Sequence, residues 1–119
     1  GGTITGVGEC VKAWTNDVRM VAVEPYECQA LSGGLLGPHN IPDMGFGLVP
    51  DNYNPYVVDK IAAVASADAL RAARTVLLTD AIPASASGGA ALAAAARFLA
   101  EGRSRAALCL IPGRTSILE

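Results

Sequence analysis

Aromatic side chains, charge and cysteine are all scarce in this sequence of 119 residues. Aromatic residues make up 5% of the chain and charged residues 17%, and the net charge is only −2, with no run of one sign. Nucleic-acid-binding proteins carry a basic patch, so this balance argues against a nucleic-acid partner. The apolar stretches are too short and too rich in Gly and Ala to span a membrane, so we expect no membrane association either.

The three cysteines are odd in number and far apart, at Cys10, Cys28 and Cys109. Their spacing matches neither a zinc site nor a disulfide framework, so we expect free thiols and no metal site. The sequence also shows no signal-peptide pattern. A cytoplasmic location is the resulting expectation.

Small aliphatic residues, by contrast, are abundant, and hydrophobic residues make up 51% of the chain. This composition favours a sheet with helices packed closely against it. The apolar spacing predicts helices over residues 5–14, 27–31, 66–78 and 90–101, and strands over 18–23, 57–64 and 106–111. Helices between strands imply parallel pairing, which makes the fold class α/β. Three short strands form a thin sheet, so we expect this chain to be one piece of a larger fold.

A long segment rich in Gly and Pro, residues 33–56, has little regular structure in this prediction. Apolar residues within it, including Ile41, Met44 and Phe46, indicate that it packs onto the rest of the molecule. Long ordered loops of this kind are often functional.

The first residues, Gly1, Gly2 and Thr3, form the most informative pattern in the chain. Two glycines let an anion approach the backbone closely, and the unpaired N–H groups of a following helix point toward it. The pattern therefore predicts a phosphate-binding loop, although most glycine-rich helix starts are plain turns. A dinucleotide-binding half-domain is a weaker reading, because Gly1, Gly6 and Gly8 do not reproduce the GxGxxG spacing.

Five motifs follow one another along the chain. They are GGTITGV at residues 1–7, VAVEP at 21–25, LSGG at 31–34 followed by Gly37-Pro38-His39 and Ile41, the Gly45, Gly47 and Pro50 series, and SGGAA at 87–91. Together they resemble the C-terminal segment of the cysteine synthase and cystathionine β-synthase family, whose members are pyridoxal-phosphate enzymes of fold type II. The resemblance covers nearly all of the chain.

This resemblance implies a fold and a chemistry. Residues 1–119 would form the C-terminal part of the large, three-layer pyridoxal-phosphate domain, in which Gly1, Gly2 and Thr3 bind the cofactor phosphate. The reaction would be β-elimination or β-replacement on a small, serine-type amino acid. The family's Schiff-base lysine lies upstream, so a complementary N-terminal chain would supply it, and a dimer of the completed unit is expected. No catalytic residue is expected in this chain, and Lys12 and Lys60 are expected to be surface charges.

Two departures from the family pattern support an alternative. Arg114 stands where the family places a hydroxyl against the pyridine nitrogen, with Thr115 one position later, and either residue could face the ring. Asp43 replaces a usual Gly. The alternative is a degenerate, non-catalytic paralogue that binds an active synthase as a regulatory or structural partner. His39, the only histidine, is expected to be structural.

Overall fold

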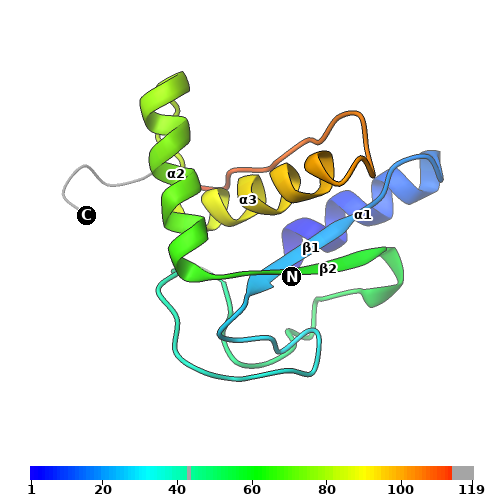
Figure 1. Ribbon diagram of the computed structural model, residues 1–119. Helices are drawn as coiled ribbons and strands as arrows, with labels where there is room; N and C mark the ends of the chain where they lie inside the picture. Colours follow the sequence, from blue (N-terminus) through cyan, green and yellow to red (C-terminus); the bar gives the residue numbers. More distant parts are fainter. Residues whose placement is uncertain (43, 114–119) are drawn as a thin grey trace.

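A computed structural model of the chain describes residues 1–42 and 44–113 and shows an α/β fold (Figure 1). Two strands, β1 (Val21–Pro25) and β2 (Lys60–Val64), pair in parallel, with Val21 opposite Lys60 and Pro25 opposite Val64. Helix α3 (Ala86–Ala100) contacts both strands and packs along α2 (Ser66–Asp80). Helix α1 (Gly2–Trp14) contacts the short 3-10 helix η1 (Pro55–Val57). The predicted fold class is confirmed.

The core is built largely from alanine, which lets helices and strands approach closely. Its buried members are Ile41, Ala62, Val64, Ala69, Ala90 and Ala94. Gly89 marks a very close approach between α2 and α3, because a Cβ at this position would overlap the Ala69 carbonyl oxygen and lie 2.9 Å from the Cβ of Ala73. The low aromatic content of the sequence is therefore matched by small side chains at the contact between the helices.

Helix α3 begins earlier than predicted, at Ala86 instead of residue 90, because Ser85 caps it. The Ser85 hydroxyl oxygen accepts a hydrogen bond from the Gly88 N–H at 3.1 Å. An N-cap serine satisfies one of the unpaired N–H groups at a helix start. Residues 86–89, which precede the predicted start, thus form the first turn of the helix.

Removing this cap tests how much α3 depends on it. We expect Ser85→Ala to lower the free energy of unfolding by about 1 kcal/mol, because the Gly88 N–H would lose its partner. Urea denaturation followed by circular dichroism measures the change. Ser85→Asn retains a side-chain acceptor and should lose much less stability; an equal loss in both variants would contradict the capping role.

The boundaries of the other predicted elements shift by a few residues. Helix α1 starts at Gly2 instead of residue 5, since the Thr5 N–H already bonds to the Gly1 carbonyl at 3.1 Å. Strand β1 starts three residues later than predicted, and β2 starts at Lys60 because η1 occupies residues 55–57. Helix α2 closely follows its predicted range.

The helix predicted over residues 27–31 is wrong, and this segment forms turns instead. The Cys28 N–H bonds back to the Pro25 carbonyl, and Cys28 forms an isolated antiparallel bridge with Leu36. The Leu31 N–H donates to a Glu24 carboxylate oxygen at 2.8 Å, not to a helical carbonyl. A buried acceptor from the neighbouring strand therefore overrides the local helix pattern.

The strand predicted over residues 106–111 is also wrong in this structure. The segment has no strand pairing, and Leu108 is 92% exposed. A strand needs a hydrogen-bonded neighbour, and neither β1 nor β2 pairs with this segment. The sequence alone indicates a buried strand, but among the described residues only α3 packs against this segment, at Cys109 and Ile111, and no strand pairs with it.

Candidate functional site

The candidate site lies at the edge of the sheet where both strands end. Parallel strands bring their carboxyl ends to one edge, and ligands of open α/β sheets bind outside that edge. Strand β1 ends at Glu24 and Pro25, and β2 leads there into the first turn of α2. The amino end of α1 lies toward the same side (Figure 1). The segments that converge here come from three separate parts of the chain: the start of α1, the end of β1, and the junction of β2 with α2.

The start of α1 presents free hydrogen-bond donors. Gly1 is the N-cap residue and makes no side-chain capping bond, and the first intrahelical bond is made only by the Thr5 N–H. Among the described residues, no group accepts from the N–H groups of Gly2, Thr3 or Ile4. Gly1, Gly2 and Thr3 are exposed, so these donors and the positive end of the helix dipole face outward.

Residues 52–54 hold this helix start in place. A Cβ on Gly1 would lie 3.0 Å from both Asn52 Oδ1 and Tyr53 Cβ, so residues 52 and 53 approach the helix start closely and would have to shift slightly for any larger residue. The Asn54 N–H donates to the Thr5 hydroxyl at 2.9 Å, and the Asn54 side-chain amide donates to Glu9. The sequence analysis did not single out these residues, because their contacts with α1 span nearly 50 positions; the Asn-Tyr-Asn-Pro series signals only a turn.

Tyr53 links the helix start to the end of β1. Burial raises the pKa of the Tyr53 phenol above its usual value, and the negative charge of Glu24 raises it further. The phenol is therefore neutral across the physiological range. The free N–H groups at the start of α1 are therefore the electropositive feature of this corner.

Glu24 organises the loop that follows β1. The residue is 4% exposed, and its carboxylate accepts hydrogen bonds from the Leu31 N–H at 2.8 Å, the Ser32 N–H at 3.1 Å and the Ser32 hydroxyl. A buried carboxylate with several donors is a fixed structural element. The Glu of the VAVEP motif thus holds residues 31–32 near the edge of the sheet.

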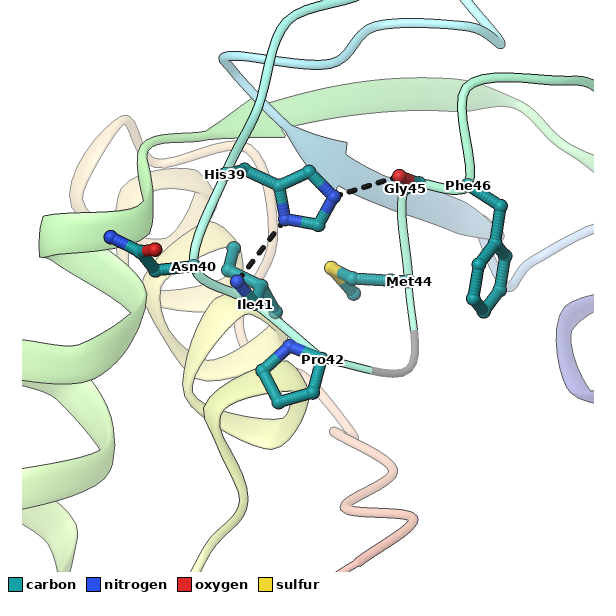
Figure 2. Close-up of a pocket in the computed structure, with 7 residues that line it drawn as sticks. All are labelled: His39, Asn40, Ile41, Pro42, Met44, Gly45 and Phe46. Carbon is teal, nitrogen blue, oxygen red and sulfur yellow. Dashed lines mark hydrogen bonds between the residues drawn. The ribbon is translucent and has the colours of Figure 1, made fainter.

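His39 clasps the next part of the loop, as Figure 2 shows. The Ile41 N–H donates to Nδ1 at 3.1 Å, and Nε2 lies 2.7 Å from the Gly45 carbonyl oxygen. Because Nδ1 accepts, Nε2 carries the proton and donates to Gly45. Both ring nitrogens are occupied within the loop, so His39 has the structural role that was expected.

The clasped loop lines a shallow, open pocket of about 420 Å³. In Figure 2, the Met44 side chain points toward Ile41, whereas Phe46 extends away from the loop. Gly45 packs tightly between His39 and Pro25, where an added Cβ would lie 2.6 Å from each. The pocket therefore adjoins the end of β1. Its described lining consists of His39, Asn40, Ile41, Pro42, Met44, Gly45 and Phe46.

Glu27 ties this loop to the start of α2. Both of its carboxylate oxygens lie 3.1 Å from the Ser66 N–H, and the Ser66 hydroxyl accepts from the Asn40 N–H at 3.0 Å. Burial raises the pKa of Glu27, but the hydrogen bonds from Ser66 outweigh it and leave the pKa below its ordinary value of 4.5. The charged form of Glu27 is therefore the one that the fold stabilises.

This lowered pKa predicts a loss of stability in acid. A carboxyl group whose pKa is lower in the folded state stabilises the fold above its unfolded pKa, and the contribution disappears as the pH falls through the folded pKa. We expect Glu27→Gln to reduce the drop in unfolding free energy between about pH 5 and pH 3. Urea denaturation at a series of pH values measures this slope. An unchanged slope in the variant would exclude Glu27 as a source of acid sensitivity.

Neither lysine is near this edge. Lys12 forms an ion pair with Asp59 at 2.6 Å and donates to the Val18 carbonyl, and Lys60 is the first residue of β2. The hydrogen bond and charge of Lys12, with the Met20 N–H, lower the pKa of Asp59. Both lysines belong to the opposite edge of the sheet, where the strands begin, which agrees with their expected role as surface charges.

The other predicted groups have plain structural places. All three cysteines are free: Cys10 is exposed, Cys28 buried and Cys109 half-buried. Burial raises the pKa of the Cys109 thiol. Asp43, Arg114 and Thr115 lie outside the described residues. Within residues 1–42 and 44–113, no helix is long and apolar enough to cross a bilayer, and no three side chains are grouped as metal ligands.

Comparison with known proteins decides the family. A family model described as "Pyridoxal-phosphate dependent enzyme" matches residues 1–113. The chain belongs to this family. The cysteine synthase of Staphylococcus aureus strain Mu50 is 34% identical over 113 residues, which is 94% of this chain and 36% of that protein. The chain thus spans about a third of the length of the curated relatives that it matches, and it corresponds to a C-terminal segment of the family.

Solved structures of family members share the fold. The cysteine synthase of Entamoeba histolytica superposes with a TM-score of 0.86 at 33% identity, over 95% of this chain and 34% of that one. A structure of O-ureido-L-serine synthase gives a TM-score of 0.87 at 29% identity, over 94% and 35% of the two chains. The O-acetylserine-dependent cystathionine β-synthase of Helicobacter pylori gives 0.77 at 26% identity, over 85% and 33%. The resemblance inferred from the motifs is confirmed, and the cofactor of this family is pyridoxal phosphate.

Proposed function

We propose that residues 1–119 are the C-terminal part of the large domain of a cysteine synthase-like enzyme, and that they act together with a complementary N-terminal chain. The main support for this proposal is the match of residues 1–113 to a pyridoxal-phosphate family. The unpaired backbone N–H groups at the start of α1 support it as well. The complementary chain would carry the Schiff-base lysine, since Lys12 and Lys60 lie at the opposite edge of the sheet.

The residues at the start of α1 fit the phosphate group of this cofactor. The unpaired N–H groups of the first turn and the helix dipole attract an anion, and Gly1 and Gly2 leave room for it to reach the backbone. The Thr3 hydroxyl adds another donor. When bound, pyridoxal phosphate supplies the electron sink for chemistry at the amino-acid α- and β-carbons. In this proposal Gly1, Gly2 and Thr3 anchor its phosphate and thereby orient its ring.

The substrate would be a small, serine-type amino acid such as O-acetylserine, with sulfide or another nucleophile adding at the β-carbon. Names of relatives support this class: cysteine synthase, O-ureido-L-serine synthase and an O-acetylserine-dependent cystathionine β-synthase. The His39-clasped loop borders the same edge of the sheet and would limit access of water and substrate. We place the assembly in the cytoplasm, as a dimer of the completed unit.

A complementation experiment tests this function. The chain is mixed with the part of the S. aureus cysteine synthase that precedes the matched segment, and pyridoxal phosphate is added. We expect a co-eluting complex with the visible absorbance of protein-bound cofactor and cysteine formation from O-acetylserine and sulfide. A complex without cofactor would contradict the enzyme and support the non-catalytic alternative, and absence of any complex would contradict the division between two chains.

A negative charge placed at Gly2 tests whether this residue lies next to the cofactor phosphate. Gly2→Asp adds a negative side chain next to the proposed phosphate, whereas Gly2→Asn adds nearly the same volume without charge. An acidic residue in the first turn favours the helix dipole, so α1 itself keeps its stability. We expect pyridoxal phosphate to bind the Asp complex at least about 10-fold more weakly than the Asn complex, since like charges repel at short range. Equal affinities would exclude Gly2 from the phosphate site.

A further inference from the structure

We propose that His39 is a positioning residue that holds the clasped loop, residues 39–42 and 44–45, against the sheet only while its ring is neutral. Protonation of this one side chain then releases the middle of the loop. The release itself involves residues 1–119 alone, whereas its consequence for substrate binding rests on the proposed function.

The ring of His39 makes one hydrogen bond of each kind. The Ile41 N–H donates to Nδ1 at 3.1 Å, and Nε2 donates to the Gly45 carbonyl oxygen at 2.7 Å (Figure 2). A neutral imidazole has one acceptor nitrogen and one donor nitrogen, whereas both nitrogens of an imidazolium are donors. Only the neutral ring can therefore make both bonds. A proton added to Nδ1 would point at the Ile41 N–H and break the first of them.

The bond that protonation removes lies at a buried position. Ile41 is 1% exposed and packs in the core with Ala62 and Val64. Among the described residues, Nδ1 of His39 is the acceptor of the Ile41 N–H. A buried N–H that loses its acceptor is costly, so the charged ring favours a conformation in which Ile41 leaves the core side of the loop and its N–H reaches water.

One end of the loop is held by contacts that do not involve the imidazole. The Asn40 N–H donates to the Ser66 hydroxyl at 3.0 Å, and the Ser66 N–H lies 3.1 Å from both carboxylate oxygens of Glu27. These bonds fix the loop to the start of α2. Protonation of His39 leaves them in place, so the chain should pivot after Asn40.

The other end of the loop also keeps a contact. The Gly45 carbonyl oxygen accepts from His39 Nε2 and, at 3.5 Å, from the Cys28 thiol. Gly45 has a positive φ of 67° and packs closely on Pro25, which fixes the turn at this end. Because both ends remain anchored, the released part is the middle of the loop around Ile41.

Among the described residues, the titratable groups around the ring are Glu27 and Cys28. The Glu27 carboxylate interacts with the charge of His39, and the Cys28 thiol shares the Gly45 carbonyl with it. Burial of Glu27 is outweighed by its hydrogen bonds with Ser66, and its pKa lies below the ordinary value of 4.5. Glu27 is therefore charged throughout the range of about pH 5 to 8, in which histidine side chains ordinarily change charge. Its constant charge cannot be the source of a pH response in this range.

Release of the loop would change the pocket beside the end of β1. Ile41 and Met44 both line this pocket of about 420 Å³, and the Met44 side chain points toward Ile41 (Figure 2). Movement of Ile41 would therefore remove the surface against which Met44 rests. In the proposed enzyme this wall borders the edge of the sheet where the cofactor binds, so the protonated form should bind a small amino acid less tightly.

Amide hydrogen exchange on residues 1–119 tests the release. Protection of the Ile41 N–H, corrected for the intrinsic exchange rate, is measured at about pH 8 and about pH 5. The Ala94 N–H, within α3, serves as the reference for global opening in the same sample. We expect the protection of Ile41 to fall at least about 10-fold relative to that of Ala94 between the two pH values. Equal relative protection at both would overturn the proposal.

Two substitutions separate the charge of the ring from its shape. His39→Asn cannot be protonated and keeps an acceptor for the N–H two residues on, as in an Asx turn, so the protection of Ile41 should change by less than about 3-fold with pH. The longer side chain of His39→Gln does not make this turn, and Ile41 should be weakly protected at both pH values. A pH response that persists in His39→Asn would assign it to a group such as Cys28 and overturn the role of His39.

The mixture with the upstream part of the S. aureus cysteine synthase connects the release to substrate binding. We expect the KM for O-acetylserine to rise between about pH 8 and pH 6 at least about 3-fold more in the wild-type mixture than in the His39→Asn mixture, because other groups titrate equally in both. Equal rises would overturn the consequence for the substrate. If Ile41 responds to pH but the mixture binds no cofactor, the role of His39 stands and the proposed function fails. If Ile41 does not respond but the mixture forms cysteine, the role of His39 fails and the proposed function stands.

Discussion

Replacing Gly89 by alanine is expected to lower the free energy of unfolding by about 3 kcal/mol, the upper part of the range for overpacked cores. The added Cβ would overlap the Ala69 carbonyl oxygen and press on Ala73, so α2 and α3 would have to separate. These helices share the most extensive contact in the fold, and Ala69 and Ala90 beside it are fully buried. Urea denaturation followed by circular dichroism at 222 nm, the usual helix signal, measures the loss.

Gly6→Ala is the matched control for this prediction. Gly6 lies within α1, and no atom outside its own helix turn comes within 4 Å of the position of an added Cβ. Alanine is the better helix former, so this variant should gain about 0.5–1 kcal/mol. If Gly89→Ala were as stable as Gly6→Ala, the close packing of α2 on α3 would be refuted.

Glu24→Ala is expected to cost about 3 kcal/mol, because it leaves buried donors without their charged acceptor. The Leu31 N–H, the Ser32 N–H and the Ser32 hydroxyl all donate to this carboxylate. Their loss would also release residues 31–32 from the end of β1, next to the proposed phosphate site. Denaturant unfolding gives the free energy, and amide hydrogen exchange at Leu31 and Ser32 reports the local release.

Glu24→Gln and Ser32→Ala remove only part of these contacts and should therefore lower the stability by smaller amounts. Glutamine keeps one acceptor oxygen and should retain part of the stability, while Ser32→Ala removes only the hydroxyl contact. We expect the losses to rise in the order Ser32→Ala, Glu24→Gln, Glu24→Ala. Unchanged exchange protection at Leu31 in Glu24→Ala would contradict the role of this carboxylate.

The helices were largely predictable because their signals are local. Apolar residues at helical spacing, together with the breaks on either side, define α2 to within two residues of its structural end. The starts of α1 and α3 are less well predicted. A glycine at residue 1 and a serine at residue 85 serve as N-caps for helices that begin in glycine-rich sequence, where helix propensity is low.

The errors fall where a distant partner decides the structure. Residues 27–31 look helical, yet the carboxylate of Glu24 takes the N–H groups that a helix would use. Residues 106–111 have the composition of a buried strand, but strand formation depends on a neighbour that the described residues do not include. In both segments the local pattern is clear, and a hydrogen-bonding partner outside the segment, present in the first case and absent in the second, determines the result.

In the candidate site, too, local features could be predicted from the sequence and contacts between separate segments could not. Gly1, Gly2 and Thr3 could be selected from the sequence because a glycine pair before a helix has a direct physical meaning. Their support by Asn52, Tyr53 and Asn54 could not, since it depends on a loop crossing the molecule. His39 was correctly expected to be structural, but only the structure shows that its two nitrogens clasp Ile41 and Gly45.

The open edge of β1 has a consequence for how this chain behaves in concentrated solution. Within residues 1–42 and 44–113, β1 pairs only with β2, so Val21 and Val23 lie on a short, uncharged strand edge with unpaired backbone groups. Such edges promote pairing between identical molecules. Pro25, which has no N–H, is the one residue of the strand that limits this pairing. Residues 1–119 produced on their own should therefore self-associate into sheet-like aggregates, and a charged residue on this edge, such as Val23→Lys, should reduce that self-association.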